Sequence, residues 1–81
     1  MDRSAIVSKT TELMRDIFDE DDLVANDGMT ADDVANWDST NHVRLIVAIE
    51  EQFHIRFENN EITVPENFGE LVDLIASKSP S

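Results

Sequence analysis

The sequence predicts an all-α fold: a small four-helix bundle of three main helices and one short helix, with a long first loop. The chain has 81 residues, which is enough for one hydrophobic core. Apolar residues make up 41% of it, with only two glycines, two prolines and no cysteine, and this composition favours packed helices over a turn-rich β structure or a disulfide scaffold. Apolar residues also recur at helical spacing in three segments. We therefore expect residues 1–81 to form a single domain.

The first helix is expected over residues 4–18, where apolar residues recur at helical spacings and form one stripe. The members of this stripe are Ile6, Val7, Leu13, Met14, Ile17 and Phe18. Four consecutive acids, residues 19–22, follow where the C-terminus of a helix favours cations. The helix should therefore end at this acidic run.

A long connection follows, from Asp19 to Trp37, and its clearest turn signal is Asn26-Asp27-Gly28. It contains more apolar side chains than a free linker would have: Leu23, Val24, Met29 and Val34. We expect this loop to pack over the helices, with a short helical turn at residues 31–34 and with Trp37 as its anchor.

The second helix is predicted to begin at Ser39, acting as its N-cap, and to run to Phe53. Asp38, just before it, places negative charge near the positive end of the helix dipole. The inward face of this helix should bury four large apolar side chains, Leu45, Ile46, Ile49 and Phe53.

The remainder of the chain predicts one short and one longer helix. Residues 55–64 indicate a brief strand-like piece and then one helical turn at residues 60–64, ended by the proline that follows. The last helix is expected to be capped by Asn67, with Glu70 as its capping-box partner. Its apolar residues are Phe68, Leu71, Val72, Leu74 and Ile75. Residues 77–81 are expected to form a frayed tail.

The charge of the chain restricts its partners. Eighteen acidic residues face six basic ones, a formal net charge of -12. Nucleic acid is excluded as a ligand because its binding needs clustered Lys and Arg, whereas a positively charged protein partner fits. The sequence has no apolar run that indicates a secretory signal or a membrane span. The absence of cysteine fits a reducing compartment, and we expect a cytoplasmic protein. The chain is also expected to be a monomer.

Neither a metal centre nor a catalytic site is predicted. The acidic run of residues 19–22 lacks the spacing of a calcium loop, and His42 and His54 have no second ligand at helical spacing. Ser39 and His42 lie three residues apart on one helix face, but a chain this small has little volume for a substrate pocket, and no glycine-rich elbow surrounds Ser39. From its surroundings alone Ser39 is a helix cap, and His42 is expected to be an exposed surface residue or one edge of a partner-binding face.

Two segments carry a further pattern. Asp38-Ser39 open the second helix, which ends in Ala48-Ile49-Glu50-Glu51-Gln52-Phe53, and the last helix contains Phe68-Gly69-Glu70-Leu71-Val72-Asp73-Leu74-Ile75. This arrangement resembles the acyl carrier protein family, in which an Asp-Ser-Leu motif opens the second helix, a run such as Ala-Leu-Glu-Glu-Glu-Phe-Gly ends it, and Val-Gly-Asp-Leu-Val-x-x-Ile lies in the last helix. The separation of the first two motifs matches without a gap. The resemblance covers nearly the whole chain.

The resemblance implies that Ser39 carries a covalent 4′-phosphopantetheine arm derived from coenzyme A, with Asp38 as the motif residue beside it. A phosphopantetheinyl transferase would attach the arm, and the thiol at its end would hold an acyl group as a thioester. The implied partners are acyl-loading and acyl-processing enzymes such as a ketosynthase or an acyltransferase, so the chain itself would be no enzyme. The core residues would pack the interior, which in this family can also shelter an acyl chain.

The second helix departs from the family pattern after the serine. Thr40 replaces the usual leucine, and His42 and Arg44 bring potential or fixed positive charge to a docking face that is normally acidic, while Glu50 and Glu51 keep its far end acidic. The expected partner-binding residues are Thr40, His42, Val43, Arg44, Val47, Glu50 and Glu51. The change favours the dedicated partners of a polyketide or another specialised pathway over general fatty-acid enzymes, although neutral surface drift explains these residues as well.

Two alternative functions stay open. An aminoacyl or peptidyl carrier would share the bundle and the modified serine, and Trp37 resembles polyketide and peptide carriers more than the general one. The strong acidity favours acyl cargo. An acidic helical adaptor that binds a basic protein and carries no prosthetic group is an alternative of a different class.

Overall fold

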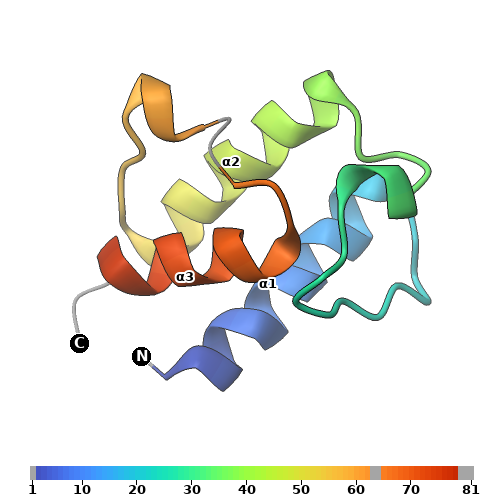
Figure 1. The fold of residues 1–81 in the computed structure, drawn as a ribbon, viewed down its shortest axis with the longest axis horizontal. Coiled ribbons are helices and arrows are strands. Elements are labelled where there is room, and N and C mark those ends of the chain that lie inside the picture. The colour runs from blue at the N-terminus through green and yellow to red at the C-terminus, as the bar shows by residue number, and fades with distance from the viewer. Residues whose placement is uncertain (1, 63–64, 79–81) are drawn as a thin grey trace.

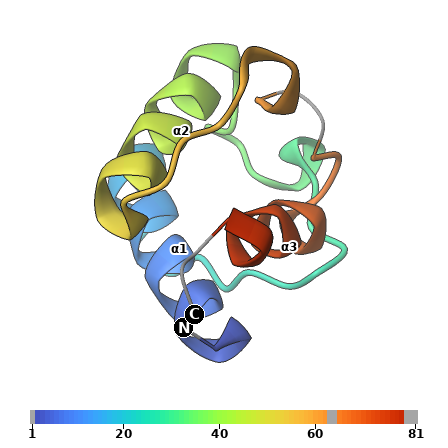
Figure 2. The same ribbon diagram turned by 90° about the vertical axis from the view of Figure 1, so that its left-hand side faces the viewer.

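The computed structural model describes residues 2–62 and 65–78. Its elements are three α-helices, α1 (Arg3–Phe18), α2 (Ser39–Phe53) and α3 (Phe68–Lys78), and two single 3-10 turns, η1 (Ala31–Asp33) and η2 (Asn59–Glu61). α1 contacts both α2 and α3 (Figures 1 and 2). The all-α class and the three main helices are confirmed, and the short turn in the first loop lies where it was predicted. The predicted fourth helix is only the 3-10 turn η2, one residue earlier than expected.

The strand-like piece after α2 does not form, because the described residues contain no strand. Instead, α2 itself provides acceptors for this segment: Ile55 N donates to the backbone oxygen of Glu50 at 3.2 Å, and Phe57 N donates to the Glu50 carboxylate at 2.9 Å. These donors therefore need no neighbouring strand. Residues 63 and 64, which the predicted turn also included, lie outside the described residues.

Side chains and left-handed residues set the ends of the first two helices. Asp2 accepts a hydrogen bond from the backbone N–H three residues on, at 2.8 Å, so α1 begins one residue earlier than predicted. α1 ends at Asp19, which has a φ of 56° and donates its N–H to the Arg15 carbonyl. The acidic run therefore marks the helix end as expected. His54 ends α2 with the same left-handed geometry, at a φ of 57°.

The first loop is fixed to the start of α3 by backbone hydrogen bonds. Phe68 N donates to Met29 O at 2.7 Å, and Gly69 N donates to Asp27 O at 2.9 Å. Asn67 Oδ1 accepts from the N–H three residues later at 2.8 Å, which confirms this residue as the cap. Loop carbonyls and a capping side chain together satisfy N–H groups that the first turn of a helix leaves without intrahelical acceptors.

Arg3 also joins α1 to the loop and to α3. Its guanidinium lies 3.1 Å from a carboxylate oxygen of Asp27 and 3.1 Å from one of Asp73. Hydrogen bonds to Asp27 and then to Asp73 raise the pKa of Arg3 above its usual range. Because these side chains are largely exposed, the pairs contribute little to stability, and the backbone bonds at α3 matter more for the position of the loop.

The last two described residues belong to α3. Ser77 Oγ donates to the Leu74 carbonyl at 2.7 Å, and Lys78 Nζ lies 2.6 Å from Glu61 Oε1 on η2. The expectation of a frayed tail from residue 77 is therefore wrong for Ser77 and Lys78, because both have partners that hold the final turn. Residues 79–81 lie outside the described residues.

The core lies between the helices and under the first loop. Its buried apolar residues are Ile6, Met14, Phe18, Met29, Val34, Trp37, Leu45, Ile46, Ile49, Phe53, Ile55, Phe57, Phe68, Leu71, Val72 and Ile75. This set includes every core residue predicted on α2. The loop packs as expected except at Val24, whose exposed fraction is 76%. Throughout the described ranges, each helix is too short or too polar to span a membrane.

Candidate functional site

Ser39 is the first residue of α2, and its side chain is exposed. The N-cap is Asp38, which has an extended backbone and accepts a hydrogen bond from Asn41 N at 2.9 Å. The prediction that Ser39 caps the helix is therefore wrong, because the carboxylate one position earlier takes that N–H. Within the described residues the Ser39 hydroxyl makes no hydrogen bond, so it is accessible and uncommitted.

The start of α2 also provides an electrostatic environment for Ser39. The backbone N–H groups of Ser39 and Thr40 have no acceptor in the part of the chain that the structure describes. They add to the partial positive charge at the N-terminus of this helix. A phosphate ester on Ser39 would lie beside these donors, which is the usual setting for a phosphate at a helix start.

A groove of about 510 Å³ opens beside Ser39. Its lining residues are Ala31, Trp37, Asp38, Ser39, His42, Val43, Ile62, Pro65 and Glu66. Apolar side chains predominate among them, and the volume falls in the range of small-molecule sites, about 300–1,000 Å³. Sequence reasoning missed Ile62, Pro65 and Glu66, because they lie more than twenty residues from Ser39 along the chain. A chain attached to Ser39 can therefore reach an apolar surface at once.

Trp37 and His42 form one wall of this groove. Trp37 Nε1 donates to His42 Nδ1 at 3.0 Å, and His42 Nε2 lies 2.7 Å from the Ile62 carbonyl oxygen. The indole ring stacks on His42 and on Phe18, with ring centroids 6.2 and 5.8 Å apart. The prediction of Trp37 as a loop anchor is confirmed. His42, expected to be exposed, is instead half-buried, because the distant Ile62 gives its ring a partner that local sequence does not show.

The same bonds exclude a catalytic pair of Ser39 and His42. An indole N–H can only donate, so Nδ1 of His42 must accept, and a carbonyl can only accept, so Nε2 must carry the proton. Neither ring nitrogen is left to take a proton from the serine.

The predicted partner-binding residues divide into two sets. Five of them are exposed on the outer face of α2, at spacings of three and four: Thr40, Val43, Arg44, Val47 and Glu51. We call these five the outer stripe. Its two valines have exposed fractions of 53% and 47%, and Arg44 has no ion-pair partner among the described residues. His42 and Glu50 are half-buried and bond to other segments instead.

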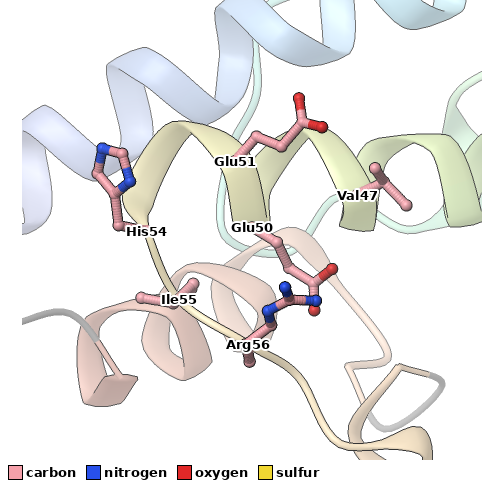
Figure 3. A pocket seen from close by; sticks show the side chains of 6 residues that line it. All are labelled: Val47, Glu50, Glu51, His54, Ile55 and Arg56. Carbon is pink, nitrogen blue, oxygen red and sulfur yellow. The ribbon is translucent and has the colours of Figure 1, made fainter.

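Figure 3 shows the far end of α2, where Glu50 and Glu51 leave the helix in different directions. Glu50 fixes the segment after the helix through its bond to Phe57 N, whereas Glu51 is exposed. Val47, His54, Ile55 and Arg56 complete a shallow pocket of about 410 Å³ there. Of the two predicted acids at this end, only Glu51 is therefore fully available to a partner.

The acidic surface forms no metal site in the part of the chain that is described. No group of three or more His, Asp or Glu side chains there is arranged to hold an ion. The carboxylates act instead as caps, ion-pair partners and solvated charge.

The described residues thus form a small helical module with three packed helices, a docked first loop and an exposed serine at the start of α2. The solution NMR structure of the holo acyl carrier protein from Geobacter metallireducens is similar to this chain, with a TM-score of 0.83 and 34% sequence identity over 90% of this chain and 84% of that chain. No protein-family model matches the chain, and no curated protein matches it. The identity and coverage show that the chain belongs to the acyl carrier protein family. It is a carrier and not a catalyst.

Proposed function

We propose that this chain carries an acyl group as a thioester on a 4′-phosphopantetheine arm joined to the Ser39 hydroxyl. The observation that carries the proposal is the exposed hydroxyl of Ser39, which has no internal partner among the described residues, at the start of a 15-residue helix and beside an apolar groove. The bound arm supplies a terminal thiol, which a cysteine-free chain does not have.

The residues around Ser39 fit this role. In the attachment reaction Ser39 Oγ bonds to the diphosphate phosphorus of coenzyme A that bears the pantetheine. The bond from this phosphorus to the bridging oxygen breaks, 3′,5′-ADP leaves with that oxygen, and the hydroxyl proton passes to the phosphopantetheinyl transferase. Asp38 holds the first turn through Asn41 N and keeps the serine at a fixed position. The backbone N–H groups of Ser39 and Thr40, which have no acceptor within residues 2–62 and 65–78, lie where they would stabilise the phosphate diester. The groove wall would then support the proximal part of the arm.

The outer stripe is the docking face in this proposal. It begins one residue after Ser39, and its exposed valines offer apolar contact while Arg44 and Glu51 offer charges of opposite sign. The net charge of -12 attracts basic partner surfaces, and Arg44, which has no ion-pair partner among the described residues, adds a place for a partner carboxylate. The partners are the transferase and acyl-loading and acyl-processing enzymes, such as a ketosynthase or an acyltransferase, of fatty-acid, polyketide or related biosynthesis.

The carrier role also bears on the compartment, the oligomeric state and the domain organisation of the chain. A thiol must stay reduced to form a thioester, so a reducing compartment such as the cytoplasm suits it. A net charge of this size makes copies of the chain repel each other, which favours a monomer. We assign residues 1–81 to one carrier domain.

The docking face is tested by replacing Val43 and Val47 with threonine, which keeps the branched shape and removes apolar surface. The double variant should raise the KM of the transferase for the chain, with unchanged helix content by circular dichroism. Val24→Thr is the matched control, because this valine is exposed but lies outside α2. Equal KM values for the double variant and the control would exclude the outer stripe as the docking face.

The carrier role is tested by intact-mass measurement after incubation with coenzyme A and a broad-specificity transferase. The chain should gain the mass of one phosphopantetheine, and Ser39→Ala should gain none. No gain in the unaltered chain would favour the acidic adaptor. An aminoacyl or peptidyl carrier would also gain the arm. The holo chain is therefore offered to an acyltransferase and, separately, to an amino-acid-adenylating enzyme. Loading by the adenylating enzyme alone would contradict acyl cargo.

A further inference from the structure

Three segments that surround Ser39 meet at His42. Trp37 lies two residues before Ser39, His42 lies three residues after it on α2, and Ile62 comes directly after η2. The indole N–H and the Ile62 carbonyl bond to opposite nitrogens of the same imidazole, at 3.0 and 2.7 Å. All three residues line the groove beside Ser39. The His42 ring therefore joins the first loop and the segment after η2 to α2 at this site.

This arrangement requires a neutral imidazole. With Nδ1 accepting from Trp37, the single ring proton is on Nε2 and is donated to Ile62. A second proton would have to go to Nδ1, where it would face the indole N–H across 3.0 Å. Protonation therefore breaks the bond to Trp37 and leaves the bond to Ile62 intact.

Both ends of the link also have contacts that do not involve His42. On the Ile62 side, η2 is fixed by the Glu61–Lys78 ion pair at 2.6 Å. On the Trp37 side, the indole has its stacking on Phe18, and the neighbouring Asn36 donates to the Phe18 carbonyl at 2.6 Å. Protonation of His42 therefore removes the hydrogen bond of the indole N–H but leaves the stacking of the indole on Phe18.

The ionisable groups near His42 come from each neighbouring segment. Asp38 lies one turn before it and caps α2, and Glu66 also lines the groove. Asp33 on η1 bonds to Thr30 N, and Glu61 on η2 is paired with Lys78. Asp32 is exposed on η1. These carboxylates are hydrogen-bonded, ion-paired or solvated. His42 is therefore the group whose protonation changes the hydrogen bonds between Trp37, His42 and Ile62.

We propose that His42 is a positioning residue for Ser39: its neutral ring fixes Trp37 and the groove wall, and its protonation releases Trp37 and slows modification of the serine. This inference rests on the proposed attachment at Ser39. Trp37 immediately precedes the Asp38-Ser39 pair, so release of the indole loosens the backbone that leads into the first turn of α2. The transferase would then bind a less ordered site around Ser39. Protonation of His42 would therefore raise the KM of the transferase for the chain more than it lowers kcat.

The link itself is tested without any enzyme, because Trp37 is the single tryptophan of the chain. The indole N–H and the His42 ring signals are followed by NMR from pH 8 to pH 5. The indole signal should change together with the titration of His42. His54→Gln is the control and should leave this transition in place, since His54 lies at the far end of α2. An indole signal that stays constant while His42 titrates would overturn the proposal.

Three substitutions separate the two hydrogen bonds. His42→Asn keeps an acceptor near the position of Nδ1, His42→Gln keeps a donor near that of Nε2, and His42→Phe keeps only the stacking. Both the Asn and the Gln variant lack the stacked ring, so their indole signals are compared with each other: they should differ in the same direction as the wild-type signals at pH 8 and pH 5, and neither should depend on pH. Identical indole signals in the Asn and Gln variants would contradict the assigned roles of the two nitrogens.

The effect on modification is measured as the KM of the transferase for the chain at each pH. The KM of the wild-type chain is divided by that of His42→Asn at the same pH, so that the pH dependence of the transferase itself cancels. Loss of the bond to Trp37, which is absent in both His42→Gln and His42→Phe, predicts a KM about three- to tenfold higher for these two variants, with rescue by His42→Asn. Equal KM values for all variants would overturn the positioning role. A wild-type chain that gains no mass at any pH would instead refute attachment at Ser39, and the NMR titration would still decide whether the link responds to pH.

Discussion

Gly69 in the first turn of α3 lies directly against Asp27 in the first loop. Gly69 N donates to Asp27 O at 2.9 Å, and a Cβ added to Gly69 would lie 3.0 Å from both the Cβ and the backbone oxygen of Asp27. Two of the three nearest atoms belong to the backbone, so they cannot move aside as a flexible side chain can. The missing side chain at Gly69 therefore allows the loop to dock on α3.

Gly69→Ala should lower the free energy of unfolding by about 1–2 kcal/mol, because the overpacking it causes exceeds the gain in helix propensity at this first-turn position. Urea denaturation measures the change. Gly28→Ala is the matched control: the atom nearest to its added Cβ is 3.7 Å away, so its stability should change by about 0.5 kcal/mol or less. Equal losses in the two variants would show that the contact with Asp27 is not the cause.

Thr10 is fully buried on α1, and its hydroxyl has no hydrogen-bond partner among the described residues. Thr10→Val keeps the shape and removes the unsatisfied group, so it should raise the free energy of unfolding by about 1 kcal/mol. Thr11→Val serves for comparison, because the Thr11 hydroxyl donates to the Val7 carbonyl at 2.7 Å and its loss should give no gain. If Thr10→Val destabilises the chain, the hydroxyl has a partner in solution.

Glu61 links stability to pH. Its pKa lies below the ordinary value of 4.5 because it accepts from Glu58 N and, secondarily, bonds to Lys78. A carboxylate with a lowered folded-state pKa stabilises the fold above the unfolded-state value, and this contribution is lost as the pH falls through the folded-state value.

The stability difference between wild type and Glu61→Gln should therefore be largest near neutral pH and should shrink on acidification below about pH 4.5. Lys78→Met should remove the smaller part of this pH dependence, since the bond to Glu58 N is the larger cause. Thermal unfolding at several pH values provides the data. A difference that grows in acid would have the wrong sign for a lowered pKa.

Asp38 should matter for the stability of α2 and for the order of Ser39. Asp38→Ala removes the acceptor for Asn41 N and should cost about 0.5–2 kcal/mol, whereas Asp38→Asn keeps an acceptor and should cost less. Denaturation together with hydrogen exchange at residues 39–41 distinguishes local fraying from a global effect. Similar losses for Ala and Asn would mean that the charge of Asp38, rather than its capping bond, stabilises the helix.

Periodicity predicted the buried faces of the helices well, because a helix that packs on one side repeats its apolar residues every three or four positions. Leu45, Ile49 and Phe53 are buried as expected. The end of α1 was also predictable, since a run of acids is unfavourable at the negative end of a helix dipole. Such local signals depend only on neighbouring residues.

The sequence-based predictions were wrong where a hydrogen-bond partner lies far away in sequence, or where two adjacent residues could both cap the same helix. Asp38 and Ser39 are both good capping residues, and the choice between them depends on backbone geometry. His42 was expected to be exposed, because nothing near it in sequence reveals its bond to Ile62. The contact between Gly69 and Asp27 is equally invisible, although a glycine in the first turn of a helix is a weak signal of close backbone approach.

The most direct test of the central claim is to locate the prosthetic group on the chain. After incubation with coenzyme A and the transferase, the protein is digested, and the modified peptide is fragmented in a tandem mass spectrometer. The added phosphopantetheine should map to Ser39 alone, and Ser39→Ala should remain unmodified even though Thr40 stands next to it. A phosphopantetheine on Thr40 or on another serine, or a mass gain that persists in Ser39→Ala, would contradict the assignment of Ser39 as the attachment site.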